Sequence, residues 1–163
     1  MEKEQLINMA YQLAHDYDVD YGFCPQCVLA AVQDVMEEGI SDDVIRSAHG
    51  LSGGGCLTGN GSCGALQGGL MAISCFYGRK REDFGKGRFL KNLTLGKKLL
   101  EKFTEKYGSE HSCHGLQTTF VGRSFDSWNP EDAIAFKESG CKNRCAEMTG
   151  DIAKWVVELL MAK

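Results

Sequence analysis

The sequence predicts an all-α fold in a single domain, and three observations support this prediction. Apolar residues recur at three- and four-residue intervals through most of the 163 residues, which is the spacing of one buried helix face. No segment shows the sustained apolar–polar alternation that is typical of a half-buried strand. Because no repeat, low-complexity tract or change of composition divides the chain, residues 1–163 are expected to form one bundle of about seven or eight helices.

The first half of the chain predicts four helices. They are expected over residues 3 to about 15, over 24–38, over 44 to about 49 and over 66–77. Pro25 suits the first turn of the second helix, where its missing N–H is not needed. Their apolar faces include Leu6, Met9, Ala10, Leu13 and Ala14, then Val28, Leu29, Val32, Val35 and Met36, then Leu66, Leu70, Ile73 and Phe76.

The second half predicts four more helices. They are expected over 88–107, over 113 to about 122, over 130–136 and over 143–161. The last has the clearest apolar face in the chain, and Gly150 is its only interruption. The buried positions predicted here are Leu95, Leu99, Leu100 and Phe103, then Ile152, Trp155, Val156, Leu159 and Leu160.

Charge and composition exclude several classes of function. The net charge of -4 and the lack of a basic stripe argue against a nucleic-acid partner. No window approaches the roughly 20 apolar residues that membrane insertion requires, and the start of the chain lacks a secretory leader. A cytoplasmic protein is therefore expected. Because structural disulfides are disfavoured in that compartment, its eight cysteines point to metal binding or redox chemistry.

A glycine-rich loop carries two of these cysteines, Cys56 and Cys63, and leads into the helix expected over 66–77. A thiol at a helix start faces unpaired N–H groups and the positive end of the helix dipole, so a thiolate is expected at Cys63. The loop lacks the Lys-Ser/Thr ending of a phosphate-binding loop, so we interpret it as a sulfur site.

Four cysteines share a location at or near predicted helix starts: Cys27, Cys63, Cys113 and Cys145. Helix amino-termini that converge would offer N–H donors to several sulfurs and offset the negative charge of a metal cluster. These four are therefore the predicted metal ligands. His114, next to Cys113, is expected to be a solvated or capping side chain.

The remaining cysteines fall into two groups. Cys24, Cys56 and Cys141 could extend the metal site or supply a redox dithiol, and Cys24 forms a C-x-x-C pair with Cys27. Cys75 lies within an apolar helix and is expected in the core. No C-x-x-C-H sequence occurs, so a covalently attached haem c is excluded.

Small residues mark the helix that follows the loop. Gly64, Gly68 and Ala72 lie four residues apart on one face, along which another backbone can come close. Glycine next to sulfur also leaves N–H groups accessible to a cofactor. Gly64 and Gly68 are therefore the predicted cofactor-binding glycines.

The segment Cys63-Gly64-Ala65-Leu66-Gln67-Gly68, with the cysteines before and after it, resembles the redox-active protein family named for its C…GCAxxG…C…C pattern. The resemblance spans roughly residues 24–145, with Cys-Gly-Ala here in place of Gly-Cys-Ala. The family is also similar to part of the split-Soret cytochromes, which are dimeric. The resemblance implies a small helical redox protein with an iron–sulfur or non-haem iron site, and it suggests a homodimer.

Three hypotheses follow. The favoured one is a cytoplasmic electron-transfer protein with an iron–sulfur cluster bound by Cys27, Cys63, Cys113 and Cys145, and with an unidentified redox partner protein. The second is a metal-free thiol–disulfide oxidoreductase that uses Cys24/Cys27 or Cys56/Cys63. The third is a zinc-stabilised interaction module, since zinc also accepts four thiolates. The sequence does not decide whether the protein is an enzyme.

Overall fold

The computed structural model describes residues 2–162, and over this range the chain forms eight α-helices, two short 3-10 helices and no strand. The all-α prediction is confirmed. The elements are α1 (Lys3–Tyr21), α2 (Cys24–Met36), α3 (Asp42–Ser47), η1 (Ala48–Leu51), α4 (Gly64–Tyr77), η2 (Arg81–Asp83), α5 (Leu90–Tyr107), α6 (Cys113–Val121), α7 (Pro130–Glu138) and α8 (Cys141–Leu160).

Helix α1 is longer than the sequence predicts, because it continues past residue 15 to Tyr21. Its buried residues are Ala10, Ala14 and Asp18, which lie four residues apart and so share one face. The polar residues between 15 and 21 hide this continuation, because a buried aspartate does not read as part of an apolar stripe.

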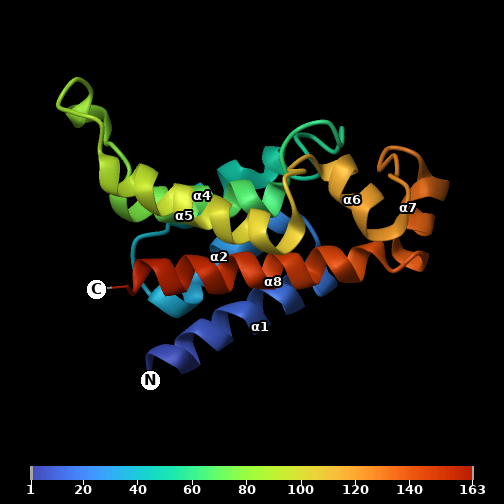
Figure 1. Cartoon of the computed structure of the whole chain (residues 1–163), viewed down its shortest axis with the longest axis horizontal. Helices are drawn as coiled ribbons and strands as arrows, with labels where there is room; N and C mark the ends of the chain where they lie inside the picture. The colour runs from blue at the N-terminus through green and yellow to red at the C-terminus, as the bar shows by residue number, and fades with distance from the viewer. Residues whose placement is uncertain (1, 163) are drawn as a thin grey trace.

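The two terminal helices, α1 and α8, lie side by side and run in opposite directions (Figure 1). Gly150 of α8 permits their close approach, since a Cβ at this position would lie 2.9 Å from the ring of Tyr11. The glycine that interrupts the last helix in the sequence is therefore a contact point between two helices. Behind α8, the core is filled by large side chains that include Leu29, Leu66, Ile73, Leu99, Phe103 and Ile152.

The glycine face of α4 packs against the start of α2. A Cβ at Gly68 would lie 2.6 Å from the backbone oxygen of Pro25, and a Cβ at Gly64 would lie 2.9 Å from Cδ of the same proline. The predicted close approach of a second backbone along this face is confirmed. It sets the distance between the two helices that carry Cys24 and Cys63 at their starts.

Helices α6 and α7 gather at the end of the bundle where α8 begins (Figure 1). The connection that contains η2 projects from the opposite end, between α4 and α5. None of the helices described is long and apolar enough to cross a membrane.

Candidate cysteine site at converging helix starts

Four helices begin with a cysteine or are capped by one. Cys24, Cys113 and Cys141 are the first residues of α2, α6 and α8, and Cys63 is the N-cap residue of α4. Cys145 lies one turn further along α8. The prediction that the cysteines lie at helix amino-termini is confirmed, with α8 beginning two residues earlier than expected.

The glycine loop contains a short left-handed segment. The five residues from Gly53 to Leu57 all have positive φ angles, between 47° and 88°. Glycine adopts this conformation freely, but Cys56 and Leu57 do so at a cost of roughly 1–2 kcal/mol each. The strained turn persists because hydrogen bonds and packing on both sides hold it.

The loop is joined to the start of α6 by backbone hydrogen bonds. The N–H of Cys63 donates to the oxygen of His111 at 2.6 Å, and the N–H of Cys113 donates to the oxygen of Gly61 at 3.0 Å. A Cβ at Gly54 would lie 3.0 Å from Cβ of Cys113, so glycine is needed for this approach. These contacts hold Cys63 and Cys113 as neighbours although they are far apart in the sequence.

A cavity of about 430 Å³ opens where these helix starts meet. Three of the residues that line it carry thiols: Cys24, Cys113 and Cys145. Its wall also includes acidic residues, basic residues and two serines, namely Asp18, Asp20, Lys137, Lys142, Ser52 and Ser127. We call this the cysteine cavity.

Two further cysteines lie next to the cysteine cavity without lining it. The thiols of Cys141 and Cys145 share a hydrogen bond, which lowers the pKa of Cys141 and raises that of Cys145. Burial and then the charge of Cys63 raise the pKa of Cys24 well above its ordinary value. Five sulfurs are thus within electrostatic reach of one another, and those of Cys63 and Cys141 are on buried residues.

Burial, more than the helix starts, sets the protonation of these thiols. Loss of solvent raises the pKa of Cys63 to about 12 and that of Cys113 to about 11. The N–H groups of Leu66 and Ala65 act on Cys63 in the opposite direction, as expected at a helix start. The prediction of a thiolate at Cys63 is wrong for the protein without a bound cation, because desolvation outweighs these donors.

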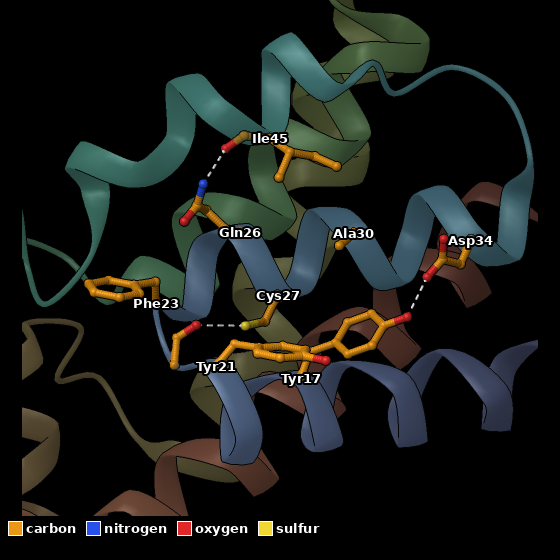
Figure 2. A pocket seen from close by; sticks show the side chains of 9 residues that line it. Tyr17, Tyr21, Phe23, Gln26, Cys27, Ala30, Asp34 and Ile45 are labelled. Carbon is orange, nitrogen blue, oxygen red and sulfur yellow. Dashed lines mark hydrogen bonds between the residues drawn. The ribbon is translucent and has the colours of Figure 1, made fainter.

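Cys27 faces a different cavity from Cys24. Figure 2 shows its thiol in a pocket of about 470 Å³ between α1 and α2, where Sγ donates to the oxygen of Gly22 at 2.9 Å. Burial raises the pKa of Cys27 to about 12. Its charge adds to the rise in the pKa of Cys24, so the two are near each other, but Cys27 does not line the cysteine cavity. We call this the aromatic pocket, and its other lining residues include Tyr17, Tyr21, Phe23, Gln26 and Asp34.

Cys56 and Cys75 neither line a cavity nor interact with the thiols described above. Cys56 is exposed on the left-handed segment, and Cys75 is half-buried on α4, packed against the core from outside. Trp128 is 71% exposed, and its Nε1 donates to the backbone oxygen of Cys56. The loop after α6 therefore braces the glycine loop from the solvent side.

Gln117 and His114 have structural roles that the sequence does not reveal. Nε2 of Gln117 lies 3.5 Å from Sγ of Cys113, while its Oε1 accepts from the N–H of Phe125 at 2.9 Å. Nε2 of His114 donates to the oxygen of Phe125, and its ring lies where a Cβ of Gly59 would be. Both side chains fix the loop after α6 next to the cysteine cavity.

Asp18 is a buried acidic residue on the wall of the cysteine cavity, with 6% of its surface exposed. It accepts a hydrogen bond from Thr149 at 3.2 Å, and burial raises its pKa to about 6. Sequence reasoning missed it, although its four-residue spacing from Ala10 and Ala14 was the available signal.

The side chains do not form a ready site for a single metal ion. Among the described residues, no three or more His, Cys, Asp or Glu side chains are grouped closely enough to hold one ion. The cysteines instead surround a cavity, which is the arrangement needed for a larger group.

Comparison with known families agrees with this arrangement of cysteines. The family described as "Putative redox-active protein (C_GCAxxG_C_C)" matches residues 22–159. The chain belongs to this family. The matched range contains every cysteine of the two cavities, so the resemblance carried by Cys63 to Gly68 is confirmed over nearly the whole chain. No curated protein and no solved structure matches the chain.

Proposed function

We propose that this redox-active protein transfers electrons through an iron–sulfur cluster in the cysteine cavity, bound by Cys24, Cys63, Cys113 and Cys145. The observation that carries the proposal is that Cys24, Cys113 and Cys145 line one cavity, while the thiol of Cys63 lies within electrostatic reach of all three. Four thiolates are the usual ligand set for such clusters. Cys24 replaces Cys27 of the sequence-based set because Cys24 lines this cavity and interacts with Cys63 and Cys113, whereas Cys27 lines the aromatic pocket.

The donor set and its surroundings suit such a group. N–H groups of Ala65 and Leu66 already act on the sulfur of Cys63, and helix starts offset negative charge. The lysines on the cavity wall, Lys137 and Lys142, act in the same direction. Binding would replace protons on buried thiols by iron and release those protons. A bound cluster would supply one-electron transfer between a donor protein and an acceptor protein.

The geometry is less favourable to the metal-free dithiol function. The side chains of Cys24 and Cys27 line different cavities, and Cys56 is exposed while Cys63 is buried. Cys141 and Cys145 are four residues apart on a helix, so their Cβ atoms are about 5–6 Å apart. A disulfide needs about 3.5–4.5 Å between Cβ atoms.

A structural zinc site is also less well supported. Zinc needs four ligands within about 2.0–2.3 Å of one point, and no such group occurs among residues 2–162. A multi-iron cluster spreads its ligands over a larger volume, which suits a cavity better than a single point. The first experiment must therefore distinguish bound zinc from an iron–sulfur cluster.

The first experiment is anaerobic purification, followed by a visible spectrum and by iron, sulfide and zinc determination per chain. We expect iron and sulfide in equal amounts, together with broad thiolate-to-iron absorbance. Zinc without iron would support the structural module instead. A metal-free protein with a reducible disulfide would support the oxidoreductase. The redox partner, a cytoplasmic location and a homodimer stay predictions, and analytical ultracentrifugation of the same sample tests the last.

A further inference from the structure

Ser52 has a buried hydroxyl group without a partner. Its residue is 2% exposed, and its Oγ forms no hydrogen bond with any described residue. Other buried polar side chains nearby are satisfied, since Thr149 donates to Asp18 and Gln117 bonds to Phe125. Leaving a buried hydroxyl unpaired costs about 1–3 kcal/mol, so an orphan of this kind needs an explanation.

The position of Ser52 connects this orphan to the cysteine cavity. Ser52 lines the cavity together with Cys24 and Cys113, directly before the left-handed segment 53–57. Its backbone is fully engaged, because its N–H donates to His49 and its oxygen accepts from the N–H of Leu57. The backbone is therefore fixed at the cavity wall, and only the hydroxyl lacks a partner.

We infer that the Ser52 hydroxyl donates a hydrogen bond to a sulfur of the centre bound in the cysteine cavity and raises its reduction potential. This inference rests on the proposed function. An O–H donor directed at sulfur stabilises the form with more negative charge, which is the reduced form. Ser52 is thus a tuning residue and contributes no bond to iron. The left-handed segment 53–57 that follows holds the backbone of Ser52 at the cavity wall.

The cavity offers a matched control. Ser127 lines the same cavity but is exposed, so its hydroxyl can be satisfied by solvent. Ser127→Ala and Ser52→Ala each remove one hydroxyl group from the cavity wall, but only Ser52→Ala removes a buried donor. A change confined to Ser52 therefore reports on burial and direction of the donor and not on cavity polarity in general.

The test compares wild type, Ser52→Ala and Ser127→Ala after anaerobic purification. Iron and sulfide are determined per chain, and the midpoint potential is measured by dithionite titration followed in the visible spectrum. We expect all three proteins to hold the same iron and sulfide, and only Ser52→Ala to shift to a more negative potential. A fully loaded Ser52→Ala protein with the potential of wild type would overturn the role of Ser52 and leave the proposed function standing.

A second pair of variants covers the case in which Ser52→Ala fails to fold. Ser52→Thr and Ser52→Val have nearly the same shape and differ in the hydroxyl group. We expect the threonine variant to have a higher potential than the valine variant at equal iron content. Equal potentials in this pair would overturn the inference. Absence of iron and sulfide from wild type would overturn both the inference and the proposed function.

Discussion

The cysteine cavity and the aromatic pocket share the wall residues 21–23 just before α2, and each is lined by one cysteine of the same C-x-x-C pair. Cys24 lines the cavity with Cys113 and Cys145, whereas the thiol of Cys27 donates to the oxygen of Gly22 among tyrosine side chains. Two cysteines of one short motif thus meet different partners. Because residues three apart lie on the same face of a helix, the difference teaches that the surrounding helices, and not the spacing, decide the partners of each thiol.

The largest effect is expected from exchanging one thiol of this pair. Cys24→Ser should lose most of its iron and sulfide, because it removes a proposed ligand from the cysteine cavity. Cys27→Ser should keep the spectrum of wild type, because its hydroxyl can still donate to Gly22. The measurement is iron and sulfide per chain with the visible spectrum. The reverse result would restore the sequence-based ligand set and contradict our assignment.

A smaller effect is expected on the pH dependence of stability, where Asp18 of the cysteine cavity should differ from Asp34 of the aromatic pocket. The pKa of Asp18 is raised to about 6 by burial. Between about pH 4 and pH 6 the carboxyl group of Asp18 keeps its proton in the folded protein but loses it in the unfolded chain. Wild type should therefore lose stability as pH rises through this range. The difference between the pKa values of the folded and unfolded chains corresponds to a loss of at most about 3 kcal/mol of stability, and this loss is absent below about pH 4.

Asp18→Asn should remove this pH dependence from the metal-free, reduced protein, as measured by denaturant unfolding at several pH values between 4 and 8. Asp34→Asn is the control, because Asp34 is an exposed residue at the aromatic pocket that accepts a hydrogen bond from Tyr17. If both variants keep the slope of wild type, burial of Asp18 is not its cause.

The smallest effect concerns the contact that positions Cys24. A Cβ at Gly64 would lie 3.0 Å from Sγ of Cys24 and from the oxygen of Leu51. Gly64→Ala should therefore destabilise the fold by about 1–2 kcal/mol, because backbone atoms must shift. Gly50→Ala, which would meet nothing within 4 Å, should be close to neutral. Thermal unfolding of both variants measures the difference, and equal midpoints would show that the α2–α4 contact adapts freely.

The order of helices and the position of cysteines at their starts could be predicted from the sequence. Helix periodicity, caps and stop signals are local, so eight helices were identified with shifts of a few residues at most ends. The end of α1 was the main error, because Asp18 interrupts an apolar stripe while remaining on its buried face. The close approach at Gly64 and Gly68 was also predictable, because glycines at helical spacing leave a smooth face.

The sequence by itself determined the all-α fold, the family and a set of cysteines that could share a site. Tertiary structure decided which of them do, because the rotation of each helix about its axis depends on its packing against the others. The close contacts of Gly64 and Gly68 with Pro25 fix the start of α2 against α4, with Cys24 at the cysteine cavity and Cys27 at the aromatic pocket. The same packing buried Asp18 and the hydroxyl of Ser52, and burial changed the pKa values of the thiols. These side chains lose contact with solvent only when segments that are distant in the sequence pack together, so no local sequence pattern could have predicted the change.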